Sequence, residues 1–291
     1  MLGLTVALAV LVGVALGVLG GGGSILTVPL LAYVAGMEAK QAIATSLLIV
    51  GVTSAVGAVS HARAGRVQWR TGLIFGVAGM AGAYAGGLFG RFIPGSVLLI
   101  GFALMMIATA IAMLRGRKAA APVAGHRIPV AKVIAEGLIV GVVTGLVGAG
   151  GGFLVVPALA LLGGLPMPVA VGTSLVVIAM KSFAGLAGYL TSVQIDWTAA
   201  GLVTAAAVFG ALLGARLTAV VNPDSLRQAF GWFVLAMSAV ILGQEIHPAV
   251  GVAWAGMTAL AATLYLTCRV ARFCPWRWLF GRRVRTAAAA A

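Results

Sequence analysis

Acidic residues are scarce in this chain. Its 291 residues include five Asp or Glu, three His and two Cys, and charged residues of both signs make up 8%, against about 25% in a typical soluble domain. The histidines are not clustered, no two carboxylates lie close together in the sequence, and no Gly-x-Ser-x-Gly motif occurs. Cys268 and Cys274 offer neither a metal-ligand spacing nor a disulfide framework. We therefore expect no enzyme activity, no metal site and no cofactor.

Apolar residues dominate instead, at 62% of the chain with a mean hydropathy of +1.15. This leaves too little polar surface to cover a water-soluble globule. A helix needs about 20 apolar residues to span a bilayer. Apolar segments lie at 2–20, 24–36, 41–60, 71–90, 96–114, 133–151, 152–164, 169–190, 199–220, 229–245 and 249–268. The predicted fold class is an all-α polytopic membrane protein that has the lipid bilayer as its partner.

The net charge of +14 would also suit a nucleic-acid-binding protein. However, 14 of the 19 basic residues fall in three blocks, at 61–70, 115–132 and 269–285, which lie between or after the apolar segments. Positively charged loops of this kind typically face the cytoplasm. The basic blocks therefore indicate cytoplasmic loops, and we expect no nucleic-acid partner.

The chain contains an internal repeat with a shift of 128 residues. Residues 17–29 align with 145–157, and residues 42–47 with 170–175, without a gap. Over 17–70 against 145–198 there are 17 identities in 54 positions, whereas chance would give roughly one in ten. The predicted organisation has five parts: transmembrane repeat 1 (1–114), a cytoplasmic basic linker (115–132), transmembrane repeat 2 (133–245), an extra transmembrane helix (249–268) and a cytoplasmic basic tail (269–291).

The two repeats differ in the charge of one equivalent loop. Loop 61–70 carries three Arg, whereas 189–198 carries none and contains Asp196. If positive loops face inside, these loops lie on opposite sides of the membrane, so each repeat crosses it an odd number of times. Five helical elements per repeat, one of them short or broken, satisfy this condition. The sequence thus predicts inverted topology, with the N-terminus outside and the C-terminus in the cytoplasm.

The second element of each repeat follows a run of glycines. Residues 25–35 reach about 16 Å as a helix, half of the hydrocarbon core. Broken helices of this kind build the substrate sites of many transporters, because their backbone N–H groups can face an anion. The alternative is that the glycines serve close helix packing. The candidate substrate-binding residues here are Gly22, Gly23, Ser24, Gly150, Gly151 and Gly152.

Two hydroxyl pairs recur at equivalent positions, Thr45-Ser46 and Thr173-Ser174. We expect them to face each other at the middle of the membrane and to donate hydrogen bonds to a substrate oxygen. The alternative is that each hydroxyl bonds back to a carbonyl of its own helix.

Lys181 stands in the middle of the apolar segment 169–190 with no acidic residue within ten positions. Such a charge costs about 2.5–3.5 kcal/mol at the centre of a membrane helix. We expect it to attract an anionic substrate; the alternative is a lysine that snorkels or bonds carbonyls. Glu136 is a candidate for proton coupling or a simple partner of the helix dipole. His61 and Arg216 are expected at the membrane boundary.

Residues 148–157 and 170–175, with their weaker copies in the first half, resemble the sulfite exporter TauE/SafE family of membrane permeases. The resemblance covers roughly residues 5–245. It implies a bacterial cytoplasmic (inner) membrane transporter for small sulfur-containing anions such as sulfite or an organosulfonate. The first half departs from the pattern, since Ser24 stands where the second half has Gly152.

The expected function is export of such an anion by alternating access of the two repeats. One alternative is a passive anion channel, and another is an ion-coupled uptake permease for a different small carboxylate or sulfonate. The partner is a small anionic substrate, and assembly into a homodimer is left open.

Overall fold

The computed structural model describes residues 2–19, 25–114, 130–148, 155–156, 159, 165, 167–217 and 223–270. These residues contain helices and turns and no strand. The helices are α1 (Leu2–Leu19), α2 (Thr27–Pro29), η2 (Leu30–Val34), α3 (Ala39–Arg63), α4 (Trp69–Gly90), α5 (Gly95–Leu114), α6 (Val130–Val147), α8 (Met167–Tyr189), α9 (Trp197–Leu217), α10 (Pro223–Glu245) and α11 (Pro248–Val270). The all-α fold class is confirmed.

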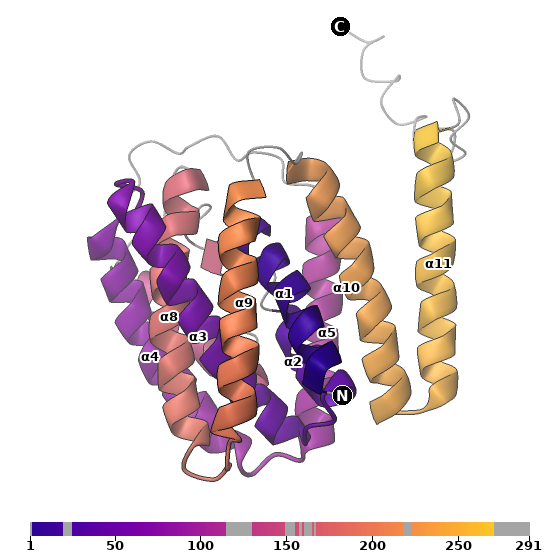
Figure 1. Cartoon of the computed structure of the whole chain (residues 1–291), viewed down its shortest axis with the longest axis horizontal. Helices are drawn as coiled ribbons and strands as arrows, with labels where there is room; N and C mark the ends of the chain where they lie inside the picture. Colours follow the sequence, from indigo (N-terminus) through magenta and orange to yellow (C-terminus); the bar gives the residue numbers. More distant parts are fainter. Residues whose placement is uncertain are drawn as a thin grey trace, which may run out of the picture.

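The sequence repeat is also a structural repeat. Helices α1, α3, α4 and α5 begin 128 residues before α6, α8, α9 and α10. The α3–α4 connection lies at the upper end of the bundle and the equivalent α8–α9 connection at the lower end (Figure 1). The two repeats therefore have inverted topology. Helix α11 lies outside the repeat and stands beside α10 at the edge of the bundle (Figure 1).

Four of the described helices are long and apolar enough to cross a membrane: α3, α4, and residues Val169–Tyr189 of α8 and Trp197–Arg216 of α9. Shorter apolar helices at Thr5–Gly17, Gly95–Ile111, Val133–Val147, Gly231–Glu245 and Pro248–Leu264 complete the bundle. This composition is that of a polytopic membrane protein.

The short second element of repeat 1 is present. Helix α2 passes at Pro29 into the π-helical turn η2, consistent with proline lacking the N–H that a regular helix would use. Gly36, at φ 69°, ends the element, because glycine adopts this left-handed conformation at little cost. Of its counterpart in repeat 2, only Val155, Val156 and Leu159 are described.

The repeats interlock, because α1 of repeat 1 packs on α9 of repeat 2, and α6 of repeat 2 packs on α4 of repeat 1. Glycines permit this approach: a Cβ added at Gly13 of α1 would collide with the carbonyl of Ala207 in α9. The equivalent contact, shifted by 128 residues, joins Gly141 of α6 to Gly79 of α4. Small residues that let helix backbones touch are the usual contact surface of membrane helices.

Helices α3 and α8 form the centre of the bundle and run antiparallel, with Gly57 beside Leu175 and Gly185 beside Leu47. One asymmetry breaks the repeat. Helix α4 packs far more extensively on α8 than the equivalent helix α9 packs on α3. One side of the central pair is therefore tightly closed, and the other is looser.

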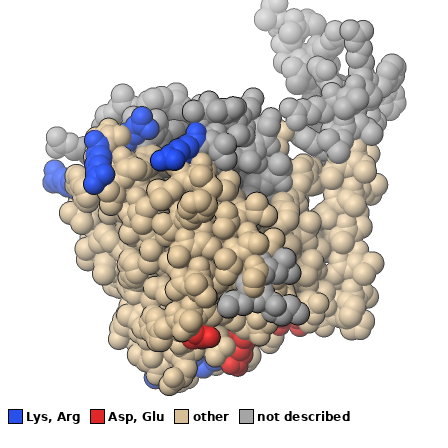
Figure 2. All heavy atoms as spheres, in the orientation of Figure 1, with Lys and Arg blue, Asp and Glu red and all other residues tan. Residues whose placement is uncertain are grey.

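Charged residues divide between the two ends of the bundle. Lys and Arg gather at the upper end, and the acidic residues in view lie at the lower end together with a little basic surface (Figure 2). The upper end holds the end of α3, the start of α4 and the end of α9, which carry Arg63, Arg66, Arg70 and Arg216. The described chain begins with α1 at the lower, acidic end of the bundle and finishes with α11 at the upper, basic end (Figure 1).

Candidate functional site

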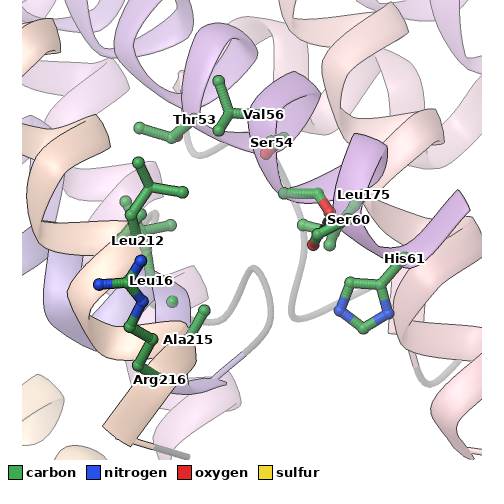
Figure 3. Close-up of a pocket in the computed structure, with 13 residues that line it drawn as sticks. Leu16, Thr53, Ser54, Val56, Ser60, His61, Leu175, Leu212, Ala215 and Arg216 are labelled. Atoms are coloured by element: carbon green, nitrogen blue, oxygen red, sulfur yellow. Dashed lines mark hydrogen bonds between the residues drawn. The ribbon is translucent and has the colours of Figure 1, made fainter. Parts of the chain in front are cut away.

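A cavity of about 250 Å³ lies between α1, α3, α8 and α9, on the looser side of the central helix pair (Figure 3). At a liquid volume of about 30 Å³ per water, this is room for roughly eight water molecules, or for one small anion with a partial hydration shell. The residues that line it are Leu16, Gly17, Thr53, Ser54, Val56, Gly57, Ser60, His61, Leu175, Ala211, Leu212, Ala215 and Arg216.

The cavity runs from the basic end of the bundle toward its middle. His61 lies in the last turn of α3 and Arg216 in the last turn of α9, and their side chains stand on opposite walls (Figure 3). Thr53 and Ser54 lie two turns deeper on α3. None of the lining residues is acidic, so the cavity suits an anion better than a cation.

The polar groups that line the cavity are unequally satisfied. The Thr53 hydroxyl donates to the carbonyl of Ile49, 2.7 Å away. The Ser54 Oγ and the His61 Nδ1 are buried and have no hydrogen-bond partner among the described residues. Buried polar groups are normally paired, so unpaired ones lining a cavity are free to bind a ligand or water.

Lys181 lies in α8 at the position equivalent to Thr53, and its side chain is 1% exposed. Its Nζ has no hydrogen-bond partner among the described residues. The structure thus buries Lys181 inside the helix in which the sequence places it, and its contact with a substrate stays a prediction. However, Lys181 does not line the cavity. Its Cβ and Cδ lie beside Gly79 of α4, on the closed side of the central pair.

The two hydroxyl pairs do not face each other, contrary to our expectation. Because α3 and α8 run antiparallel, Thr45-Ser46 and Thr173-Ser174 lie toward opposite ends of the helix pair. The hydroxyls of Ser46 and Ser174 donate to carbonyls three residues earlier, at 2.8 Å each, as the alternative reading anticipated.

Two of these hydroxyls also join distant segments. Ser46 Oγ lies 2.7 Å from the carbonyl oxygen of Gly148, at the end of α6. Thr173 Oγ1 accepts a hydrogen bond from the backbone N–H of Gln68, before α4, at 2.9 Å. These bonds hold the two repeats together at either end of the bundle, and any contact with a substrate stays a prediction.

The remaining predicted residues can be placed only in part. Gly22, Gly23, Ser24, Gly150, Gly151 and Gly152 lie outside the described residues. Glu136 lies half-buried near the start of α6 and does not line the cavity. Within the described part of the chain, no group of three His, Cys, Asp or Glu could hold a metal ion.

Sequence reasoning missed several residues of this region. His61 and Arg216 were expected only to mark the membrane boundary, yet both line the cavity. Ser54 and Ser182 were not singled out, although each is buried, lacks a partner among the described residues and falls on the other under the 128-residue shift. The repetition of serine at these two equivalent positions was the sequence signal that could have identified both residues.

Comparisons with known proteins agree with this architecture. The profile of the family described as "Sulfite exporter TauE/SafE" matches residues 5–241. A "Probable membrane transporter protein" of Xylella fastidiosa is 36% identical over 259 residues, which cover 86% of this chain and 95% of the relative. A similarly named protein of Methanocaldococcus jannaschii is 28% identical over 239 residues, which cover 76% and 89%.

No solved structure matches the chain. The family match covers both repeats and stops before α11, and the names of the relatives point to a membrane transporter rather than an enzyme. The chain is therefore a membrane transporter protein that belongs to the sulfite exporter TauE/SafE family.

Proposed function

We propose that the protein exports a small sulfur-containing anion, such as sulfite or an organosulfonate, by alternating access of its two repeats. The family description supplies the substrate class. The inverted repeats supply a plausible mechanism, because rocking of one repeat against the other can expose a central site to each side in turn.

The direction follows from the distribution of charge. We assign the basic end of the bundle to the cytoplasm of a bacterial inner membrane, because positive loops are retained inside. The N-terminus is then outside, the C-terminus is inside, and the cavity opens toward the cytoplasm. A negative interior drives an anion outward by about 2.3 kcal/mol per charge per 100 mV, so export needs no coupling ion, and we give Glu136 no required role in it.

The observation that carries the anion proposal is the unpaired ammonium of Lys181. A charge buried in a membrane bundle needs a partner of opposite sign, and such residues commonly mark substrate pathways. No described side chain gives Lys181 a hydrogen-bond partner. The cavity mouth adds Arg216 as a second positive charge on the cytoplasmic path.

The direct test is transport by the purified protein in liposomes loaded with radiolabelled sulfite, thiosulfate, an alkylsulfonate or sulfate. We expect saturable efflux of at least one sulfur anion and a higher melting temperature in its presence, because ligand binding stabilises the folded state. If no sulfur anion is transported and a carboxylate is, the substrate is a carboxylate and the proposed substrate class is wrong.

In the same assay, Lys181→Ala should reduce flux to the level of empty liposomes while the protein remains folded. The reason is that the substrate loses its fixed positive partner. Lys40→Ala is the matched control, since Lys40 is only partly buried and its Nζ donates to the carbonyl of Arg91 at the acidic end. Full transport by the Lys181 variant would remove this residue from the proposal.

A passive anion channel is the alternative from a different class. A channel gives ion flux without saturation or counterflow, whereas a carrier shows both. The closed packing of α4 on α8 favours the carrier, because it leaves the cavity without an equivalent on the other side of the central pair.

A further inference from the structure

The buried polar atoms without a partner form a pattern across the two repeats. Among the described residues they are Thr27 Oγ1, Ser54 Oγ, His61 Nδ1, Lys181 Nζ and Ser182 Oγ. Ser54 and Ser182 occupy equivalent positions, and Lys181 stands where repeat 1 has Thr53. All four residues are buried, at 4%, 2%, 1% and 0% exposed in the order Thr53, Ser54, Lys181 and Ser182. Thr53 and Ser54 nevertheless line the cavity, and Lys181 and Ser182 do not.

The region around Lys181 is the repeat-related counterpart of the cavity, and it is closed. A Cβ added at Gly87 of α4 would lie 2.5 Å from the carbonyl oxygen of Gly185 in α8. One added at Gly188 would lie 3.0 Å from the Cα of Gly87. Tyr189 packs its ring against Gly90 and donates a hydrogen bond of 2.6 Å to the Leu146 carbonyl of α6.

The two interfaces carry different residues at equivalent positions, and the smaller residues are found at the more tightly packed interface. The closed interface has Gly87 and Gly188, whereas the open one has Ala215 and Ser60 at the equivalent positions. Two glycines let α4 and α8 touch backbone to backbone. The larger side chains of Ala215 and Ser60 hold α9 away from α3 and leave the cavity between them.

From this geometry we infer that Lys181 and Ser182 form a second anion half-site, closed in this structure, which opens toward the acidic end of the bundle when α4 and α8 separate. It rests on the proposed function and takes the same small anion, with Lys181 as its charged ligand and Ser182 as a hydroxyl donor. The anion would enter past Thr53 and Ser54 and leave past Lys181 and Ser182, with Tyr189 closing the exit.

The test is thiol labelling from each side of the membrane. In a background with Cys268→Ser and Cys274→Ser, single variants Ser54→Cys and Ser182→Cys place thiols at equivalent positions of the two half-sites. A membrane-impermeant maleimide should label Ser54→Cys from the basic end. It should label Ser182→Cys only from the acidic end, and more slowly.

Opening the closed interface should change the labelling rate of Ser182→Cys and leave that of Ser54→Cys unchanged. The variant Gly87→Ala with Gly188→Ser gives the closed interface the side chains of the open one, and it should speed labelling of Ser182→Cys severalfold. Ala215→Gly with Ser60→Gly is the matched change and should slow labelling of Ser54→Cys. Tyr189→Phe, which removes a single hydrogen bond, is the milder opening variant if the glycine variant misfolds.

Labelling of Ser182→Cys from the basic end, or no labelling from the acidic end in either opening variant, would overturn the half-site. These outcomes are independent of the substrate. If no sulfur anion is transported but labelling follows the expected pattern, the half-site stands and the substrate class fails. If sulfite is transported and Ser182→Cys stays unlabelled in every variant, the substrate class stands and the half-site fails.

Discussion

At the scale of single residues, the molecule keeps two kinds of buried polar group. Tyr189 is fully buried and its hydroxyl is paired with a carbonyl of another helix. Lys181 is equally buried and its ammonium has no hydrogen-bond partner among the described residues. Paired groups stabilise the fold, whereas an unpaired charge destabilises it. In the proposed function, a transported anion supplies the partner that Lys181 lacks among the described residues.

Tyr189→Phe should lower the stability of the bundle. The change removes the hydrogen bond to Leu146 without altering the packing of the ring, and such bonds contribute about 0.6–1.7 kcal/mol in membrane bundles. Thermal unfolding in detergent should show a melting temperature lower by a few degrees. Tyr84→Phe is the control, because Tyr84 is 44% exposed. Equal shifts in the two variants would mean that the hydrogen bond contributes nothing.

Arg216→Gln should weaken substrate capture from the basic end of the bundle. Arg216 lines the cavity mouth opposite His61, and one exposed charge contributes about 1 kcal/mol, so KM should rise roughly fivefold at low ionic strength. The effect should shrink at high salt because mobile ions screen exposed charges. Liposome flux over a range of substrate and salt concentrations measures both.

The control for the mouth is Arg91→Gln, at the other end of α4, where the guanidinium stacks on Phe92 at 4.5 Å. That variant should leave KM for efflux unchanged. A KM that is unaltered in Arg216→Gln, or altered equally in Arg91→Gln, would exclude a specific role for the mouth charge.

At the scale of helices, glycine decides which pairs can touch. The contacts of α1 with α9 and of α4 with α6 are equivalent position by position, for example Gly210 on Val10 and Gly82 on Leu138. Each has no room for a Cβ against a carbonyl of the facing helix. These two pairs are therefore packed backbone against backbone, one at each side of the α3–α8 centre.

Gly82→Ala should destabilise the α4–α6 pair, because its Cβ would collide with the Leu138 carbonyl, a backbone atom that cannot rotate away. Overpacking of this kind costs about 1–3 kcal/mol. Gly101→Ala in α5 is the control, since nothing lies within 4 Å of its added Cβ. We expect a lower melting temperature for the first variant only; a neutral result would show that α4 and α6 can separate freely.

Much of the element scale could be predicted from sequence. The 128-residue shift and the charge of loop 61–70 gave the repeats, their helices and their inverted arrangement, because apolar length and repeated motifs are local signals. The placement of the cavity was not predictable. It depends on how far α9 stands from α3, which follows from small differences such as Ala215 against Gly87 in a packed bundle.

The error over the hydroxyl pairs has a similar cause. Residues that are equivalent in an inverted repeat come together only near the symmetry axis, and lie farther apart the farther they are from it. Thr53 and Lys181 lie near the middle of α3 and α8, whereas Thr45 and Thr173 lie close to the starts of these helices. Repetition of Thr-Ser-Leu therefore indicated a shared structural role without indicating proximity.

At the scale of the whole molecule, α11 is an addition to the two-repeat bundle. Among the described helices, α10 is the one on which α11 packs extensively. Gly251 closely approaches Gly243 there, and Trp254 Nε1 donates a hydrogen bond of 3.0 Å to Ser238 Oγ. Its outer face exposes apolar residues such as Val252 and Leu260. In a bilayer this face is covered by lipid, or by a second copy of the chain if the protein forms the homodimer that the sequence leaves open.

The position of α11 allows the predicted topology to be tested with one pair of fusions. The predicted topology places five elements in each repeat before α11, so a chain that ends after His247 should finish outside, whereas a chain that ends after Val270 should finish in the cytoplasm. A reporter phosphatase that folds only outside the cytoplasm should be active in the first fusion and inactive in the second. A fusion after Lys118, in the basic linker, is the inactive control. Activity in the reverse order would turn the whole molecule over and place the cavity mouth outside. Uptake of an anion through that mouth would run against the inside-negative potential and would need a coupling ion.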